Sequence, residues 1–433
     1  MRKATSVLAE FAAETRYDDI PEEVIHETKR LFLDTIGCII AGSVTEKGRL
    51  VRDVMAKLGG RPESTVIGEG SRRRNRTSCT NAAFVNAEFG NALDLDETFL
   101  FLAHLGSIVV PASLAISEVK RSGGKDVIAA IALGYEIACR VSLSTGIAKT
   151  GSDYRPSFAP SIFSASVSAG RLLELDKAQM QNDIGTAGFF APLPGFVKYS
   201  KHLDVPMIKS DPYGWIAQGG VTAALLAKNG YTGYLDILDG ENGFWKMQGY
   251  SSCDYDLMLG GLGKKWWMRR LSYKPYPCCR VFHAALDALY QIKREENLDS
   301  NRIESITVRL PHSISRFNNS NPRTPIETEF SLPHAISAAA IGLGLTDWNT
   351  SKTMNDERVK RLRKKVRVIT DPSLGEVMRY DTNYAGWPSS IEVRSGGVTH
   401  KEARTSAKGE QANNERTMDD SDLREKFGVF TGP

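Results

Sequence analysis

Asn91-Ala-Leu-Asp-Leu-Asp-Glu-Thr98 is followed without a break by Phe-Leu-Phe-Leu-Ala-His104-Leu-Gly-Ser107. The stretch places three acidic residues beside a threonine and adds a histidine, between largely apolar flanking segments. Burial perturbs the pKa values of acidic groups and imidazoles, and a proton donor or acceptor works best when its pKa lies near the operating pH. The stretch therefore predicts a site for proton transfer. The structural alternative is a helix end capped by Asp and Thr, with His104 in a satisfied core position.

On both sides of this stretch, the pattern of apolar residues is that of consecutive helices, with almost no strand pattern before about residue 250. Asp18-Asp19-Ile20-Pro21 is a helix start signal, because acidic residues precede a proline at a first helical position. The segment 161–175 is rich in Ser, Ala and Gly, which suits a helix packed tightly against others. Further helices are expected over residues 4–15, 78–92, 108–120, 126–143, 177–190 and 218–229. This succession predicts a large all-helical domain over residues 1–264.

The character of the sequence changes after Trp266-Trp267. Three segments alternate apolar and polar residues as strands do, at 306–310, 366–369 and 390–394. Helices are expected between or before them, at about 281–295, 333–343 and 355–364. The pattern predicts a smaller α+β domain over residues 265–400, so the fold class is mainly α with a small mixed domain. A last segment, 418–427, again has capping residues and helical spacing.

Composition limits the possible functions. The chain has 433 residues, of which 41% are hydrophobic and 24% charged, as is usual for a soluble globular protein. We expect no membrane span, because we find no run of about 18 apolar residues. We expect no nucleic-acid partner, because the net charge is only +4 and no nucleic-acid-binding motif accompanies it. The six cysteines lack metal-like spacing. Without an export signal at the N-terminus, they are expected to be reduced thiols in a cytoplasmic protein.

Six motifs in a fixed order resemble the MmgE/PrpD family. The family pattern HALDFDDT…HPG stands here as NALDLDET…HLG. The other five are LDTIGCIIAGS (33–43), VVPASLAISE (109–118), GYEIACRV (134–141), KPYPCCRVFHAALDAL (274–289) and EFSLPHAISAAAIGL (329–343). The resemblance covers most of the chain. It implies a homodimer built largely through the helical domain, and a C-terminal segment, 401–433, that returns to that domain.

The resemblance also implies chemistry on di- or tricarboxylic acids without a metal or an organic cofactor. Positive groups hold the carboxylates, and an acid/base pair moves protons beside one of them. Removal of a proton next to a carboxylate requires nearby cations or hydrogen-bond donors that stabilise the developing charge. The first expectation is a lyase, either a dehydratase or a decarboxylase, on a citrate- or aconitate-like acid. The alternatives are an epimerase of a dicarboxylate such as iminodisuccinate and a non-catalytic relative that binds a carboxylate.

Four places carry the candidate residues. In the first, Asp94 and His104 are the expected proton-transfer pair, with Thr98 orienting. In the second, Asp-Tyr154-Arg155-Pro, the arginine takes the place of a family histidine. Arginine cannot shuttle protons at ordinary pH but can hold a carboxylate in a bidentate fork. The structural alternative is an exposed loop.

The third place is Lys209, which matches a family lysine and can present its ammonium to an anion; a solvated lysine is the alternative. The fourth is Lys274-Pro-Tyr-Pro-Cys-Cys279-Arg280-Val-Phe-His283. A helix is expected to start near Arg280, and a helix N-terminus favours carboxylates, so Cys279 and Arg280 are expected to bind the substrate. His283 is the second acid/base candidate, on a face shared with Cys279 or Arg280. The alternative is a core histidine, and no histidine here has a partner at metal-ligand spacing.

Overall fold

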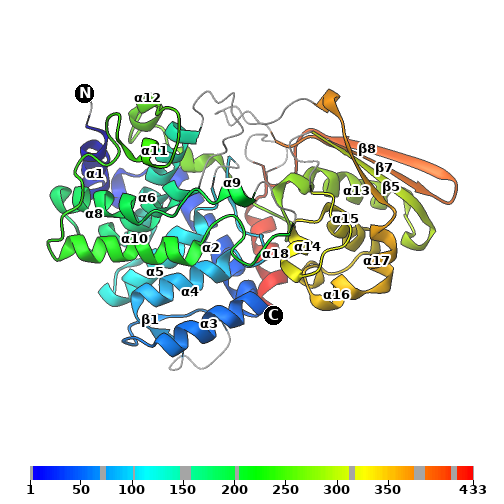
Figure 1. The fold of residues 1–433 in the computed structure, drawn as a ribbon, viewed down its shortest axis with the longest axis horizontal. Helices are drawn as coiled ribbons and strands as arrows, with labels where there is room; N and C mark the ends of the chain where they lie inside the picture. The colour runs from blue at the N-terminus through cyan, green and yellow to red at the C-terminus, as the bar shows by residue number, and fades with distance from the viewer. Residues whose placement is uncertain are drawn as a thin grey trace. The chain divides into compact units, whose positions relative to one another are not determined.

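The structure is a computed structural model that describes residues 3–68, 75–100, 103–146, 158–199, 204–311, 317–374, 386–410 and 417–432. Its contacts divide the chain into two compact units (Figure 1). The first unit comprises Met1–Ala92, Asp96–Ser200 and Ile208–Leu271; the second comprises Leu93–Leu95, Lys201–Met207 and Ser272–Pro433. The three residues Leu93–Leu95 therefore belong to the second unit, although the chain on either side of them belongs to the first.

The first unit is built from helices. The longer ones are α1 (Ala4–Glu14), α2 (Glu22–Ser43), α3 (Glu46–Leu58), α4 (Cys79–Gly90), α5 (Gly106–Lys120), α6 (Gly124–Gly146), α7 (Ile162–Leu172), α8 (Lys177–Phe190) and α10 (Tyr213–Lys228). Helix α10 packs against both α4 and α8 (Figure 1), and α7 packs against α5, α6, α8 and α10. The sequence prediction of a helical domain followed by a smaller mixed one is confirmed.

Small residues allow α7 to lie close to its neighbours. A Cβ on Gly134 of α6 would come within 2.4 Å of the Ser164 carbonyl oxygen, and one on Gly220 of α10 would come within 2.5 Å of Ala165. Both α6 and α10 therefore need glycine where they cross α7. Helix α6 contains an apolar segment, within Gly124–Thr145, that is long enough to cross a membrane. However, 89% of the most apolar part of this segment is buried inside the structure. Its apolar surface is that of a core helix, since its neighbours already cover it.

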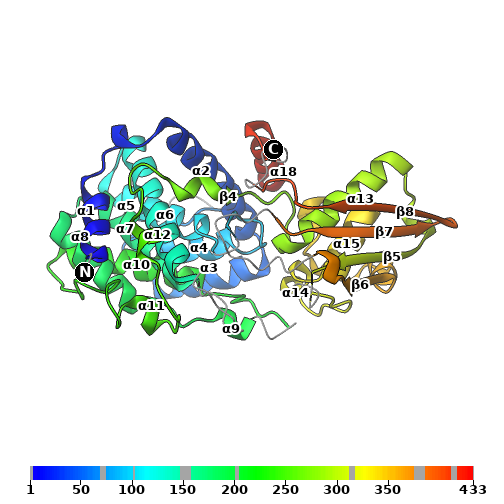
Figure 2. The same cartoon turned by 90° about the horizontal axis from the view of Figure 1, so that it is seen from above.

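The second unit contains a four-stranded sheet in the order β6-β5-β7-β8. Its strands are β5 (Ile303–Leu310), β6 (Val366–Thr370), β7 (Ser389–Ser395) and β8 (Val398–Arg404). The β5–β6 pair is parallel and the other two pairs are antiparallel. Over residues 306–310 of β5 and 389–393 of β7 every second side chain is buried, as expected for a sheet with one covered face. Helix α13 (His283–Glu296) packs against β7 and β8, and α15 (Leu332–Ile341) against β6 (Figure 2).

The C-terminal helix α18 (Asp420–Thr431) groups with the second unit. The return of segment 401–433 to the helical domain, which the family resemblance implied, stays a prediction. Two contacts hold α18 within the second unit. The Lys408 ammonium lies 2.5 Å from an Asp422 carboxylate oxygen, and Lys426 Nζ donates to the Leu95 carbonyl oxygen at 2.9 Å. These bonds join α18 to the end of β8 and to the short Leu93–Leu95 segment.

Candidate active site

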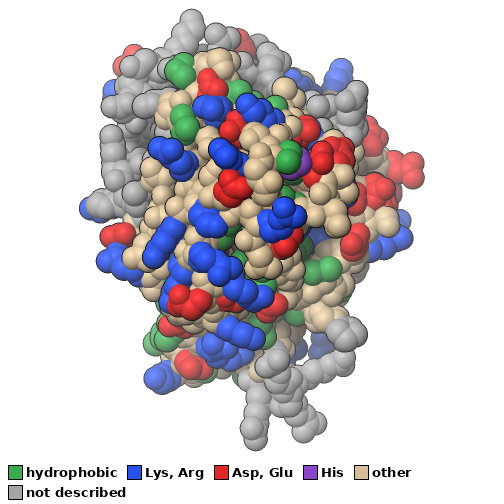
Figure 3. Space-filling view, turned by 90° about the vertical axis from the view of Figure 1, so that its right-hand side faces the viewer, with side chains coloured by type: hydrophobic (Ala, Val, Ile, Leu, Met, Phe, Trp, Pro, Cys, Tyr) green, Lys and Arg blue, Asp and Glu red, His purple; other side chains and the backbone are tan. Residues whose placement is uncertain are grey.

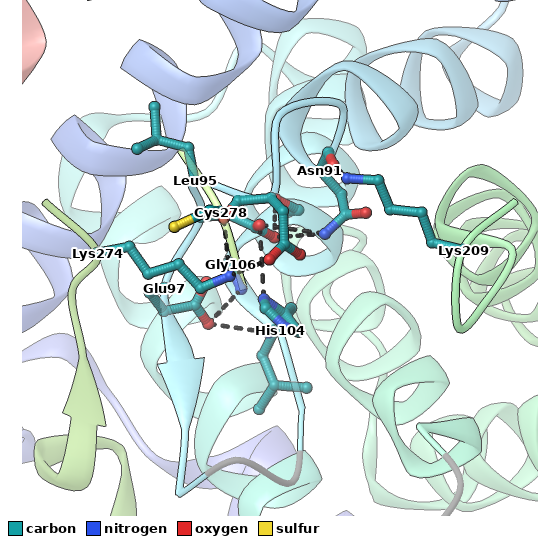
Figure 4. A network of polar contacts seen from close by, with 12 residues as sticks. Asn91, Leu95, Glu97, His104, Gly106, Lys209, Lys274 and Cys278 are labelled. Carbon is teal, nitrogen blue, oxygen red and sulfur yellow. Dashed lines mark hydrogen bonds and ion pairs between the residues drawn. The ribbon is translucent and has the colours of Figure 1, made fainter. Parts of the chain in front are cut away.

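His104 lies against a buried carboxylate just before α5. Its Nδ1 is 3.5 Å from Asp96 Oδ1, an ion-pair distance rather than a hydrogen bond. The Asp96 side chain is fully buried, whereas that of His104 keeps 12% of its surface exposed. The carboxylate is held from two further sides, because Asn91 Nδ2 donates to both oxygens at 3.1 and 3.2 Å and Ser107 Oγ donates to Oδ2 at 2.7 Å. Figure 4 shows Asn91 and His104 on different sides of this network of polar contacts.

Two aromatic rings flank the His104 imidazole within the first unit. The Phe158 ring lies 5.9 Å away and the Tyr213 ring 6.2 Å away, both in edge-on arrangements. Aromatic walls exclude water from one side of the imidazole and strengthen its interaction with Asp96, because electrostatic forces grow in a low-dielectric setting. A largely buried imidazole beside a buried carboxylate is an arrangement that can hold and move one proton.

Glu97 fixes the loop that carries His104. Its Oε1 accepts hydrogen bonds from the backbone N–H groups of Leu105 and Gly106, both at 2.8 Å, and from the Tyr135 hydroxyl at 3.1 Å. Burial, together with the neighbouring charge of Asp96, raises the pKa of Glu97 to about 8. Near neutral pH this side chain is therefore mostly a neutral acid, which binds the first turn of α5 without adding a second negative charge beside His104.

Lys209 precedes α10 in the sequence, and its ammonium reaches the same loop from another side. Its Nζ donates to the Asn91 backbone carbonyl at 2.5 Å, and only 5% of the residue is exposed (Figure 4). Its backbone has φ +56°, a left-handed conformation that side chains other than Gly, Asn and Asp rarely adopt. Asn91 thus connects two candidate residues, because its side chain binds Asp96 and its carbonyl binds Lys209.

Asp94 pairs with Lys274 within the second unit. Lys274 Nζ lies 2.8 Å from Asp94 Oδ2 and also donates to the Asp94 carbonyl oxygen at 2.8 Å. Both residues are buried, and Asp94 has φ +49°. Within the first unit the structure pairs His104 with Asp96, while Asp94 binds Lys274 within the second unit. The proton-transfer pairing of Asp94 with His104 stays a prediction.

Asp94 in the second unit and Lys209 in the first both have a left-handed backbone. The other non-glycine residues with positive φ among those described are Arg121 and Asn297, which are the C-caps of α5 and α13, Glu174, which follows the C-cap of α7, and Leu100, which follows β3. Asp94 and Lys209 cap no helix. Strained backbone of this kind persists where the surrounding structure over-determines it, and it gathers at functional sites.

His283 occupies the core of the second unit. It has no exposed surface, its Nε2 lies 3.2 Å from the Cys278 carbonyl oxygen, and its Nδ1 lies 3.4 Å from Arg280 Nη1. The pKa of His283 is lowered well below its ordinary value by burial and by the cations of Arg280 and Lys274. A neutral imidazole satisfies both contacts, because Nε2–H donates to the carbonyl and Nδ1 accepts from the guanidinium. This geometry favours the core-histidine alternative over the predicted acid/base role.

Arg280 is also committed to the protein backbone. Its Nη2 donates to the carbonyl oxygens of Tyr273 at 2.5 Å and Gly409 at 3.4 Å, and its Nη1 donates to that of Lys408 at 3.3 Å. Only 2% of the residue is exposed. The segment before it is fixed as well, because the Cys279 backbone N–H donates to the Glu329 carbonyl at 2.9 Å. These contacts give Arg280 and Cys279 clear structural roles, and their assignment to substrate binding stays a prediction.

Three further predicted residues complete the set. Thr98 begins the short strand β3 (Thr98–Phe99) and is 3% exposed, next to Glu97 in the chain; its orienting role stays a prediction. Tyr154 and Arg155 lie outside the described residues. Among the residues that the structure does describe, no group of three or more His, Cys, Asp or Glu side chains is arranged to hold a metal ion.

Sequence reasoning missed the residues that support the site. Asp96 and Glu97 lie within the stretch first singled out, and Lys274 opens one of the six motifs, but none was assigned a role. A signal was present for Asp96, because three acids beside one histidine left the choice of partner open. No local signal marks Asn91 or Ser107, whose roles depend on how the chain folds back on itself.

Comparison with known proteins supports the resemblance. Residues 6–252 match the MmgE/PrpD N-terminal domain, and residues 276–433 match the MmgE/PrpD C-terminal domain. A cis-aconitate decarboxylase of Aspergillus terreus is 29% identical over 338 residues, which is 74% of this chain and 63% of the relative, so the match spans less than two thirds of its length. A cis-aconitate decarboxylase of Mus musculus is 25% identical over 99% of this chain and 86% of the relative. One of Homo sapiens is 24% identical over 82% and 74%.

Proposed function

The chain belongs to the MmgE/PrpD family, and we propose that it is a cofactor-independent lyase that decarboxylates a cis-aconitate-like di- or tricarboxylic acid. The names of its relatives support decarboxylation before dehydration, since the three described above are cis-aconitate decarboxylases. The observation that carries the proposal is the Asp96–His104 pair, which places a proton carrier against a fully buried carboxylate.

The proposed reaction breaks the bond between a carbon atom and its carboxylate. CO2 leaves, and the electron pair of that bond moves into the remaining unsaturated acid, where a neighbouring carboxylate spreads the charge. The imidazolium of His104 then gives a proton to carbon and becomes neutral. Asp96 stabilises the charged imidazolium at Nδ1, so that Nε2 carries the proton that is transferred. The next turnover begins when the imidazole takes up a proton from water.

Lys209 is the proposed carboxylate-holding cation. An ammonium that is 95% buried attracts a carboxylate more strongly than one in water, because fewer water molecules compete for it. Its bond to the Asn91 carbonyl and its left-handed backbone fix the position of the ammonium. The same ammonium can stabilise the negative charge that develops when CO2 leaves.

Proton NMR in D2O tests the proposal directly. Purified protein is mixed separately with cis-aconitate, citrate, 2-methylcitrate and iminodisuccinate, and the spectra are followed with time. Decarboxylation predicts new olefinic signals, release of CO2 and one deuterium on the carbon that receives the proton. Olefinic signals from citrate without CO2 would indicate a dehydratase. Deuterium uptake without a change of carbon skeleton would indicate an epimerase, and either result would overturn the decarboxylase assignment.

A further inference from the structure

The second unit contains a pocket of about 680 Å³ beside α13 and the end of β8. No residue to which the proposed reaction assigns a role lines it. The volume lies within the range of about 300–1,000 Å³ that is usual for small-molecule sites. Its charged lining consists of Arg294, Arg404, Lys408, Asp287 and Asp422, so three cations face two acids.

The two acids are already engaged by donors of the protein. Asp287 Oδ1 accepts from the Tyr276 hydroxyl at 2.8 Å, and its Oδ2 accepts from the Lys408 backbone N–H at 2.6 Å. Asp422 pairs with the Lys408 ammonium at 2.5 Å and also accepts from the Asp419 backbone N–H at 3.0 Å, closing the capping box of α18. Each carboxylate therefore has both oxygens occupied. A cationic ligand would have to displace these bonds.

The two arginines have N–H donors that no described residue engages. Arg404 donates through Nη1 to Glu402 and through Nη2 to Gln291, which fixes the guanidinium between β8 and α13. A guanidinium carries five N–H groups, so some of them remain available to a ligand. Arg294, one turn beyond Gln291 on α13, is exposed and makes no hydrogen bond or ion pair with any residue that the structure describes.

On the face drawn in Figure 3, Lys and Arg side chains are interspersed with Asp and Glu, so no large field of one sign marks that face. What distinguishes the pocket is a hollow in which both carboxylates already have their oxygens bonded, whereas Arg294 is unpaired among the described residues and Arg404, although paired with Glu402, has N–H groups that no described residue engages. These remaining donors favour a ligand that accepts hydrogen bonds from guanidinium groups.

We propose that this pocket binds a small anion that carries carboxylate or phosphate groups. Arg404, which the protein holds in place, and Arg294, which is exposed, are the two arginines that bind it. Planar guanidinium groups bind both kinds of oxyanion through paired N–H donors, which is why the two share one site chemistry. Because Arg294 and Gln291 lie on α13 while Arg404 lies on β8, the anion bridges a helix and the sheet on which it packs. Its binding is expected to raise the thermal stability of the full chain.

Isothermal titration calorimetry with inorganic phosphate and, separately, with citrate tests the proposal on the full chain. Arg294→Gln is expected to weaken binding by about tenfold or more, since charge-assisted hydrogen bonds are the strong ones. Arg361→Gln, another exposed arginine of the second unit, is the matched control and should bind as the wild type does. The two titrants decide between phosphate and carboxylate as the preferred group.

A second variant separates this pocket from the candidate active site. Lys209→Gln should leave binding at the pocket unchanged. Anion binding that is lost in Lys209→Gln and kept in Arg294→Gln would place the anion at the active site and overturn the proposal. Absence of saturable binding by either titrant would overturn it as well. None of these readouts uses turnover, so failure of the proposed lyase activity would leave the result unaffected.

Discussion

His104 Nδ1 lies 3.5 Å from Asp96 Oδ1, while Asp96 itself is held by Asn91 and Ser107. Asn91 and Ser107 therefore fix the carboxylate through neutral donors. When the His104 imidazole is protonated, it becomes a cationic partner of the same carboxylate. Substitution Asp96→Asn removes the charge and keeps the shape. We predict that kcat falls by about 10²-fold or more with a small change in KM, because Asp96 supports proton transfer rather than substrate binding.

Steady-state kinetics on the acid identified by NMR measures this effect. Asp53→Asn, at an exposed position of α3, is the matched control and should behave as the wild type does. An Asp96→Asn variant that folds normally and retains wild-type kcat would show that the pair has no part in turnover.

Lys209→Gln tests the proposed carboxylate contact. Loss of one buried cation facing an anion is expected to raise KM by about tenfold or more, and kcat falls as well if the ammonium also stabilises the developing charge. Lys57→Gln, an exposed lysine of α3, serves as the control. If kcat and KM do not change in Lys209→Gln, Lys209 has no part in substrate binding or turnover.

Glu97 should make stability depend on pH. Its pKa rises from 4.5 to about 8 in the folded chain, so between those values the folded state keeps a proton that the unfolded state has lost. The contribution of Glu97 to the free energy of unfolding is therefore complete below about pH 4.5. It then declines by up to about 1.4 kcal/mol per pH unit as pH rises towards 8.

Urea unfolding at several pH values between about 5 and 8 measures that slope. Glu97→Gln cannot ionise, so its stability should decline less steeply with pH than that of the wild type. Glu241→Gln, at an exposed position, should keep the wild-type slope. Identical slopes in Glu97→Gln and wild type would contradict the assignment of a neutral acid.

His283→Ala should act mainly on stability. It leaves the Cys278 carbonyl and the Arg280 guanidinium without their imidazole partner in a fully buried place, which costs about 1–3 kcal/mol. Chemical denaturation measures the loss, and kcat per folded molecule should change far less than in Asp96→Asn. A variant of normal stability with a large loss of kcat would instead restore the acid/base role that the sequence suggested.

Much of the fold could be predicted because its elements carry periodic apolar patterns. The expected helix at 108–120 is α5 (Gly106–Lys120), and the expected strand at 306–310 lies within β5 (Ile303–Leu310). Strand β8 was missed, since its side chains are mostly exposed or half-buried and its sequence, VTHKEAR, lacks apolar alternation. An edge strand of this kind is stabilised by its pairing with β7, which no local pattern reveals.

The candidate site shows the same limit more sharply. Acids and an imidazole among apolar residues indicated the stretch and His104 locally, whereas Lys209 was proposed from the family resemblance. The pairing of His104 with Asp94 stays a prediction, and the structure shows Asp96 beside His104 within the first unit, a choice that three neighbouring acids left open. It assigned chemistry to His283, whereas burial and a fixed tautomer make that imidazole a poor proton carrier. Composition cannot distinguish a buried, fully bonded histidine from one that faces a substrate.

The central claim is that His104 delivers the proton to carbon. The most direct measurement is the rate of deuterium-labelled product formation from cis-aconitate in D2O, compared between wild type and His104→Gln at equal folded concentration. We predict product with one deuterium from the wild type and a rate lower by about 10²-fold or more for the variant. Undiminished formation of labelled product by His104→Gln would contradict the account.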